Sequence, residues 1–392
     1  GTSMTSATTG QAKPRIAPVL LTLAILLSAS PLTAPIVQAR PAPRAAAGEE
    51  DSIRYAVRRG DTLSRLAADY MVTLEAWRTV GRINRIAEPR AIPIGTMLTV
   101  PTRLLKAEPL GAHIITFRGE GRIEASGTAT PLAVGLAVEP GMVIETGTGS
   151  FATLELSNGS RITLPSHTRL RVTAMRRFLL TGSVDFDFLL EKGRLETGAT
   201  PLGARGGRYR IRTPIAVSAV RGTTFRIGYE EGGAPSLTEV IEGIVAVAPP
   251  GGHTETAVEK GFGASVAANG ALTIEKLLPA PELLQPGRLQ VDPLVTLSLA
   301  PLDGARAYHV QIARDAGFVD LEQETYVATP EIRFADVANG QWFVRATGVA
   351  ASGLEGLPRT YTMRRMLTGL DGSAERDAGG GLKPGQSDDA DG

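Results

Sequence analysis

Hydrophobic and polar positions alternate in different ways along the chain, and the changes of pattern divide it into segments. Residues 53–101 begin with an alternating run, continue with apolar residues at helical spacing, and end with the short run MLTVP. This order predicts a strand, two helices and a second strand. Gly60 permits a turn before the first predicted helix. Asp61 or Thr62 can cap that helix, because a side-chain oxygen there can accept a hydrogen bond from a free backbone N–H.

From about 112 to 276 the apolar residues recur at every second position, which is typical of β-strands. Runs of this kind flank Asn158-Gly159, Lys192-Gly193 and Glu242-Gly243, and each of these pairs predicts a hairpin turn. The pattern predicts no helix here, so we expect a closed or stacked β-structure. Further short strands between 288 and 365 predict a small sandwich.

The predicted fold class is therefore multidomain and mainly β, with a small α+β unit of βααβ order, an all-β domain and a β-sandwich. The expected segments are a signal peptide at 1–39, a linker at 40–52, the α+β unit at 53–106, the all-β domain at 112–276, a Pro-rich linker at 277–287, the sandwich at 288–365 and a disordered tail at 366–392. Residues 1–3 precede Met4 and are interpreted as a cloning scar or a misplaced start. The acidic, Gly-rich tail lacks the apolar residues needed to fold.

The N-terminal residues have the features of a secretory signal peptide. Lys13 and Arg15 precede the apolar run VLLTLAILL at 19–27, and Val37-Gln38-Ala39 resembles a cleavage site. The apolar run has about half of the ~20 residues that span a bilayer. We expect export to the periplasm or cell envelope with cleavage after Ala39. The alternative is an uncleaved membrane anchor.

Composition limits the chemistry that the chain can perform. It has no cysteine, which excludes disulfides, thiolate metal sites and cysteine nucleophiles. The net charge of +1 gives the whole chain no bias towards nucleic acid. No metal-ligand spacing relates its histidines, which are His113, His167, His253 and His309. We therefore expect no catalytic residue, no metal and no cofactor, and we predict that the protein is not an enzyme, a cell-wall hydrolase included.

A set of motif residues in the first unit matches a known pattern in order and spacing: Tyr55, Val57, Gly60-Asp61-Thr62-Leu63, Leu66-Ala67, Val72-Thr73, Ile94-Gly95 and Pro101. This set resembles the LysM domain. The resemblance implies a βααβ fold that binds glycans containing N-acetylglucosamine, here peptidoglycan. It places the glycan-binding groove between Gly60, Asp61, Thr62 and Leu63 on one side and Ile92, Pro93, Ile94 and Gly95 on the other.

Two further features of this unit bear on the groove. LysM domains often have an asparagine at the end of the second helix, where the spacing puts Gly81. Asn84 fits this place only if the helix is three residues longer. Residues 53–106 also carry ten Lys and Arg against four Asp and Glu. This excess indicates either a solvated face or attraction to an anionic wall or membrane surface, which salt would screen.

The stretch TPIAVSAVRGTTFR at 213–226, supported by segments at 141–164, 191–197 and 239–248, resembles the periplasmic FecR domain. The resemblance implies a β-scaffold that contacts protein partners. In the founding family this domain relays a receptor's state to a sigma factor, through a membrane span and a cytoplasmic helical domain. A cleaved chain is expected to have neither, so we expect the fold to transfer and the regulator role not to. Arg221 and Arg226 are interpreted as buried or strand-capping residues.

Segments at 307–315, 343–349 and 353–356 resemble a fibronectin type III-like sandwich, with Leu297 or Leu299 in place of a usual tryptophan. Together these features predict an exported, non-catalytic envelope protein that binds peptidoglycan and presents a FecR-like domain for protein interaction or sensing. The alternative is a periplasmic or membrane-anchored signalling regulator of the FecR type. The expected partners are peptidoglycan or a related glycan and an envelope protein. Nucleic acid is not expected, and a membrane is expected only if the N-terminal segment stays uncleaved.

Overall fold

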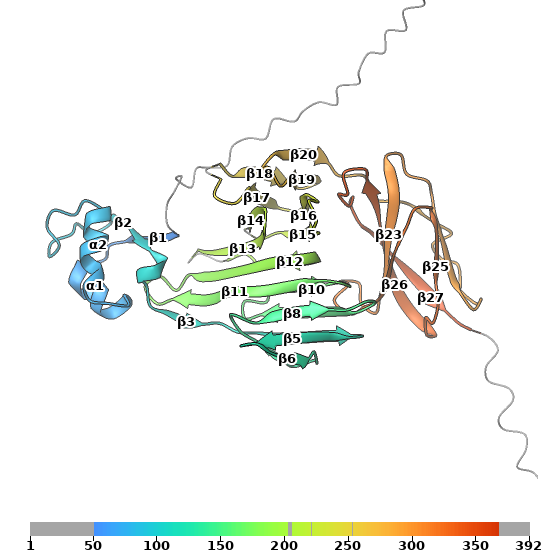
Figure 1. Ribbon diagram of the computed structural model, residues 1–392, viewed down its shortest axis with the longest axis horizontal. Helices are drawn as coiled ribbons and strands as arrows, with labels where there is room; N and C mark the ends of the chain where they lie inside the picture. The colour runs from blue at the N-terminus through green and yellow to red at the C-terminus, as the bar shows by residue number, and fades with distance from the viewer. Residues whose placement is uncertain (1–50, 203–205, 221, 253, 368–392) are drawn as a thin grey trace, which may run out of the picture. The chain divides into compact units, whose positions relative to one another are not determined.

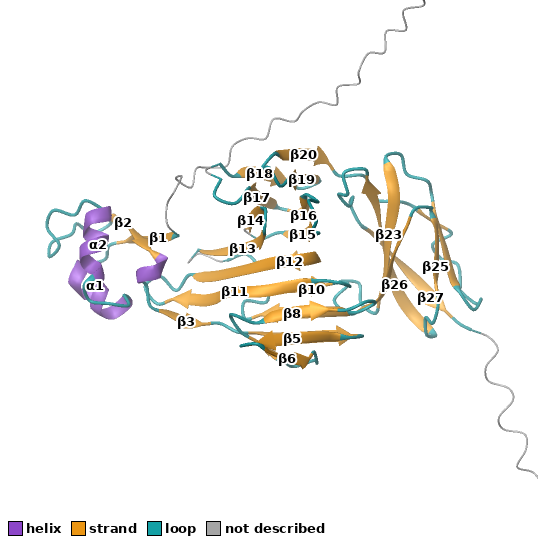
Figure 2. Ribbon diagram, viewed as in Figure 1, coloured by secondary structure: helices purple, strands orange, loops and turns teal. Residues whose placement is uncertain are grey.

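The computed structural model describes residues 51–202, 206–220, 222–252 and 254–367 (Figure 1). The predicted signal peptide, most of the predicted N-terminal linker, Arg221 and nearly all of the predicted tail lie outside these residues. Strands dominate, and the two α-helices lie near the start of the described chain (Figure 2). A small α+β part followed by several β-sheets confirms the multidomain, mainly-β fold class. Within the described ranges, no helix is both long and apolar enough to cross a membrane.

The first part is the βααβ unit. Its elements are β1 (Ser52–Ala56), α1 (Leu63–Tyr70), α2 (Ala76–Ile83) and β2 (Met97–Pro101), followed by the 3-10 helix η1 (Thr102–Leu104). The two strands pair antiparallel, with Tyr55 opposite Leu98. Leu66 and Val80 face these residues in a shared core, because apolar residues at helical spacing give each helix one buried side.

The second part is a closed β-barrel that runs from β3 to β20. Its strands are β3 (Ala107–Pro109), β4 (Ala112–Arg118), β5 (Gly121–Ala125), β6 (Thr128–Pro131), β7 (Ala137–Val138), β8 (Val143–Thr146), β9 (Phe151–Leu156), β10 (Arg161–Leu164), β11 (Arg169–Phe178), β12 (Val184–Gly198), β13 (Gly207–Thr213), β14 (Ala216–Val220), β15 (Thr224–Tyr229), β16 (Ser236–Glu242), β17 (Ile244–Ala248), β18 (Thr256–Glu259), β19 (Phe262–Val266) and β20 (Leu272–Lys276).

The long strand β12 links the two sheets of the barrel. Its first half pairs with β11 and β13, and its second half pairs with β10 and β15. Inward-facing residues of both sheets, such as Phe188, Ile211, Phe225 and Val240, form one hydrophobic core. This core is the reason for the strict alternation of apolar and polar residues in this part of the sequence.

The structure confirms one of the three predicted hairpins and corrects two. β9 and β10 pair across the turn at Asn158-Gly159, as expected. At Lys192-Gly193 there is no hairpin, because β12 continues through Gly193 and changes sheet there. At Glu242-Gly243 the chain does turn, but the two strands pair with different neighbours. β16 pairs with β15 and β19, whereas β17 pairs with β14 and β18.

Gly193 explains how one strand can serve two sheets. Its φ is +92°, a left-handed conformation that bends the strand and that residues with a Cβ adopt only under strain. A Cβ at this position would lie 2.6 Å from the carbonyl oxygen of His167. The glycine is therefore required both by the backbone bend and by the close approach of a neighbouring chain segment.

The third part is the C-terminal sandwich. Its strands are β21 (Leu283–Leu284), β22 (Val295–Leu299), β23 (Ala305–Ala313), β24 (Leu321–Val327), β25 (Glu331–Phe334), β26 (Gly340–Ala350) and β27 (Arg359–Arg365). The sheet orders are β21-β22-β25 and β24-β23-β26-β27. Leu297 and Leu299 from one sheet and Trp342 from the other belong to the same core. The resemblance to fibronectin type III remains a prediction.

The βααβ unit continues directly into the barrel. η1 ends at Leu104, and β3 begins three residues later and pairs with β11. Phe178 at the end of β11, and Leu180 in the turn that follows, are buried in the core of the βααβ unit. The barrel therefore supplies part of the apolar core around which α1 and α2 pack.

Candidate functional site

One wall of the predicted groove is the turn between β1 and α1. Gly60 has a φ of +87°, which glycine reaches without strain. Thr62 is the N-cap of α1, and its Oγ1 accepts a hydrogen bond from the backbone N–H of Arg65 at 3.2 Å. This bond satisfies one of the donors that the first helical turn leaves free. Of the two capping residues that the sequence offers, the structure selects Thr62.

Asp61 stabilises the turn in a different way. Its Oδ2 accepts hydrogen bonds from the hydroxyl of Tyr55 and from the backbone N–H of Arg58, both at 2.7 Å. Burial, together with the carboxylate of Asp61, raises the pKa of Tyr55 to about 12, so the phenol stays protonated and donates at neutral pH. Asp61 thus fixes the shape of the wall instead of capping the helix.

The opposite wall is the loop at 92–95, immediately before β2. Backbone hydrogen bonds join the two walls. The N–H of Gly95 donates to the carbonyl of Val57 at 2.8 Å, and the N–H of Leu63 donates to the carbonyl of Pro89 at 3.1 Å. The structure therefore brings together the two loops between which the sequence places the groove.

The predicted site residues differ in solvent exposure: two are buried, and six are exposed or half-buried. Leu63 and Ile92 are only 0% and 7% exposed and pack into the core, so only their backbone can border a ligand. Ile94 is 66% exposed, and Gly60 and Gly95 present backbone without a side chain. The remaining members are exposed or half-buried: Pro93, Asp61 and Thr62. An apolar side chain beside open backbone suits the face and the N-acetyl group of a sugar.

Asn84 caps the end of the second helix, and Gly81 does not occupy this place. Asn84 directly follows α2, and its Nδ2 donates to the carbonyls of Val80 and Thr99, both at 2.8 Å. Its Oδ1 accepts from the N–H of Thr99 at 2.7 Å. Gly81 lies inside the helix, where a Cβ would come within 3.1 Å of Leu63. Asn84 thus ties the end of α2 to β2.

Two protein-family models match parts of the chain. The model of the LysM domain matches residues 55–101, and the model of the FecR protein matches residues 142–246. The chain carries a LysM domain and a FecR domain. The LysM domain is the βααβ unit, and the FecR domain is the middle of the barrel. The matches support glycan binding by the first and a signalling-regulator kind of domain in the second.

Three solved structures are similar to parts of the chain. Two are structures of a candidate anti-sigma factor from Parabacteroides distasonis ATCC 8503, with 18% and 16% identity over 34% and 38% of this chain and TM-scores of 0.28 and 0.30. The chain spans 59% of the first and 78% of the second. The third is the extracellular domain of a candidate one-component system from B. thetaiotaomicron, with 9% identity over 65% of this chain and 50% of that chain and a TM-score of 0.17. No curated protein matches the chain.

A group of buried and half-buried charged residues, here called the charge cluster, joins the barrel to the C-terminal sandwich. It contains Arg194, Arg226 and Glu239 from the barrel and His309, Glu324 and Glu355 from the sandwich. Arg194 donates to both carboxylate oxygens of Glu239, at 2.7 and 2.9 Å. Arg226, only 6% exposed, donates to the carbonyls of Glu355 and Gly356 at 3.1 and 2.6 Å.

The interpretation of Arg226 as a buried structural residue is confirmed, while Arg221 lies outside the described residues. The carboxylate of Glu355 is the centre of the cluster. Burial opposes its ionisation, but Arg194, and then His309 and Arg226, hold its pKa well below the usual range. No local sequence signal could have found this cluster, because its members come from segments far apart in the chain.

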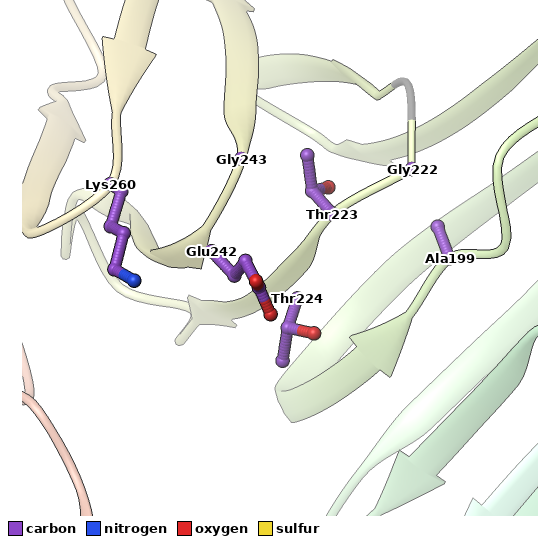
Figure 3. A pocket seen from close by; sticks show the side chains of 7 residues that line it. All are labelled: Ala199, Gly222, Thr223, Thr224, Glu242, Gly243 and Lys260. Atoms are coloured by element: carbon purple, nitrogen blue, oxygen red, sulfur yellow. The ribbon is translucent and has the colours of Figure 1, made fainter.

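The barrel also has an open hollow of about 520 Å³ (Figure 3). Four chain segments line it. They are Ala199 after β12, the start of β15, the turn at Glu242-Gly243, and Lys260 between β18 and β19. Figure 3 labels the side chains that line it, including those of Glu242 and Lys260. Within the described chain, no group of three or more His, Asp or Glu residues is placed to hold a metal.

Proposed function

We propose that this protein is a non-catalytic protein of the bacterial cell envelope that binds peptidoglycan through its LysM domain. The observation that carries the proposal is the LysM match at 55–101 together with the arrangement of the two predicted loops, which backbone hydrogen bonds join beside the exposed Ile94. LysM and FecR domains are typical of the periplasm and cell envelope, which supports this localisation.

Binding to purified peptidoglycan sacculi tests the proposal, with two variants of matched chemistry. Ile94→Asp places a carboxylate on an exposed groove position, so it leaves the core intact and is expected to weaken retention by about tenfold. Val72→Asp is the control because Val72 is 55% exposed and its N–H donates to Leu104, beyond the far end of β2. Because the five residues of β2 alone span roughly 16 Å, this control position lies well away from the loop at 92–95.

The expected result is retention of the unaltered protein and of Val72→Asp, and loss of Ile94→Asp, with all three folded by circular dichroism. Absence of retention for the folded, unaltered protein at low salt would refute peptidoglycan binding. Equal loss for both variants would place the contact outside the groove.

A second candidate function rests on the FecR match at 142–246, which favours a periplasmic or membrane-anchored signalling regulator. In this case the barrel would contact a protein partner, and glycan binding would only localise the protein. N-terminal sequencing of the exported protein separates the envelope protein from a membrane-anchored regulator. A start at residue 40 agrees with the envelope protein, whereas an intact N-terminal segment in the membrane fraction agrees with the regulator.

A further inference from the structure

The two walls of the LysM groove each carry arginines next to the bonds that join them. Val57, which accepts from the N–H of Gly95, is followed by Arg58 and Arg59. Pro89, which accepts from the N–H of Leu63, is followed by Arg90. All three arginines are exposed. Their main chains are therefore fixed at the edge of the predicted groove, and their exposed side chains are long enough to reach a ligand there.

The acidic groups nearby accept hydrogen bonds from other donors and form no ion pair with the guanidinium groups of these arginines in the described residues. The carboxylate of Asp61 binds the hydroxyl of Tyr55 and the N–H of Arg58, and Glu88 accepts from the N–H of Arg90. No carboxylate of the described residues forms an ion pair with the guanidinium of Arg58, Arg59 or Arg90. The guanidinium of Arg58 lies over the ring of Tyr55, 5.7 Å from its centre, which keeps its donors available.

We propose that the groove prefers glycan strands that carry carboxylates over neutral strands with the same sugar backbone. The proposal rests on the proposed function, and it names the chemical class of glycan. Ile94 and the open backbone contact the sugar, and Arg58, Arg59 and Arg90 bind carboxylates that project from the strand. A guanidinium suits this role because its planar fork can donate two hydrogen bonds to one carboxylate.

The test compares two probes in titrations with the full-length protein. One probe is soluble peptidoglycan strands, and the other is the same strands after their carboxylates have been converted to amides. Tighter binding of the carboxylated strands is expected. Each exposed guanidinium–carboxylate pair should contribute about two- to fivefold at low salt. The preference should shrink between roughly 0.01 and 0.15 M salt, as the screening length falls from about 30 to about 8 Å.

Substitutions identify the residues that produce the preference. Arg58→Gln and Arg90→Gln should each reduce binding of the carboxylated strands and leave binding of the amidated strands unchanged. Arg306→Gln is the control, because it removes the same charge from an exposed position at the start of β23 in the sandwich. It should change neither titration.

The outcomes separate this inference from the proposed function. Equal binding of both probes overturns the carboxylate preference and leaves glycan binding intact. Binding of neither probe by the folded protein refutes both. A third arm uses vesicles of anionic phospholipid. If Arg58→Gln and Arg90→Gln weaken vesicle binding while both strand probes bind equally, the arginines serve a membrane surface and the inference is wrong.

Discussion

Nδ1 of His309 lies 3.0 Å from Oε2 of Glu355, and Nε2 of the same ring lies 3.0 Å from Oε2 of Glu324. One buried imidazole thus stands between two carboxylates. Burial would lower the pKa of His309, but Glu355 and then Glu324 raise it to about 9. The ring is therefore charged at neutral pH and completes a balanced charge cluster, in which two arginines and one histidine face three glutamates.

The first prediction concerns pH. The pKa of His309 rises on folding from 6.5 to about 9, so its stabilising effect is complete below pH 6.5 and is lost as the pH rises through 9. The free energy of unfolding of the unaltered protein should therefore fall, relative to that of His309→Gln, by up to about 3 kcal/mol between pH 6 and pH 10. Urea denaturation at several pH values measures this difference. A difference that does not change with pH would contradict a charged His309.

The second prediction concerns the central carboxylate. Glu355→Gln leaves Arg194, Arg226 and His309 buried with less opposing charge, so it should reduce the free energy of unfolding by about 3–5 kcal/mol. Glu275→Gln is the control. The exposed Glu275 on β20 accepts a hydrogen bond from Ser352, which precedes Glu355 by a few residues, and its loss should cost less than about 0.5 kcal/mol. Similar urea midpoints for the two variants would show that the cluster contributes little.

The third prediction concerns the strand shared by both sheets. Gly193→Ala forces a Cβ into a left-handed position and against the carbonyl of His167, so it should destabilise the barrel by about 3 kcal/mol. Gly198→Ala, in the same strand, should change stability by less than about 0.5 kcal/mol, because nothing lies within 4 Å of its Cβ position. Thermal unfolding compares the two. Equal tolerance of both alanines would show that the change of sheet in β12 does not require a glycine at position 193.

The fourth prediction concerns the LysM domain. Asn84→Ala removes the three hydrogen bonds that tie α2 to its own last turn and to β2, at a cost of about 1–3 kcal/mol. The amide of Thr99 should then exchange its hydrogen faster, which mass spectrometry can follow. Asn269→Ala is the control: the side chain of Asn269 accepts a hydrogen bond from the nearby N–H of Ala271, and its loss should leave Thr99 protected. Unchanged exchange at Thr99 in Asn84→Ala would rule out this tie.

Local sequence patterns predicted the elements whose partners lie close in the chain. Thr62 and Arg65 are three residues apart, and the hairpin at Asn158-Gly159 joins adjacent strands. The same glycine signal was misleading at Gly193. A left-handed glycine serves a tight turn and a change of sheet equally well. Which of these occurs depends on whether the second half of β12 finds a partner elsewhere, here β15.

The candidate site shows the same limit. The LysM motif predicts two loops that the structure brings together, but it does not separate Leu63, which packs inward, from Ile94, which is exposed to solvent. Helix length was also needed to identify Asn84. The charge cluster was beyond sequence reasoning, because Arg226 and Glu355 are 129 positions apart and their burial depends on how two β-domains pack.

The burial of Phe178 and Leu180 in the LysM core has a mechanical consequence. Under the proposed function, tension on a bound glycan strand would reach the barrel through this apolar contact and through the chain that leads into β3, which pairs with β11. Ion pairs of Asp51 with Arg208 and Arg210 add polar contacts between the two domains. Under the proposed function, a load on the LysM domain would therefore be passed to the strands of the barrel that it packs against.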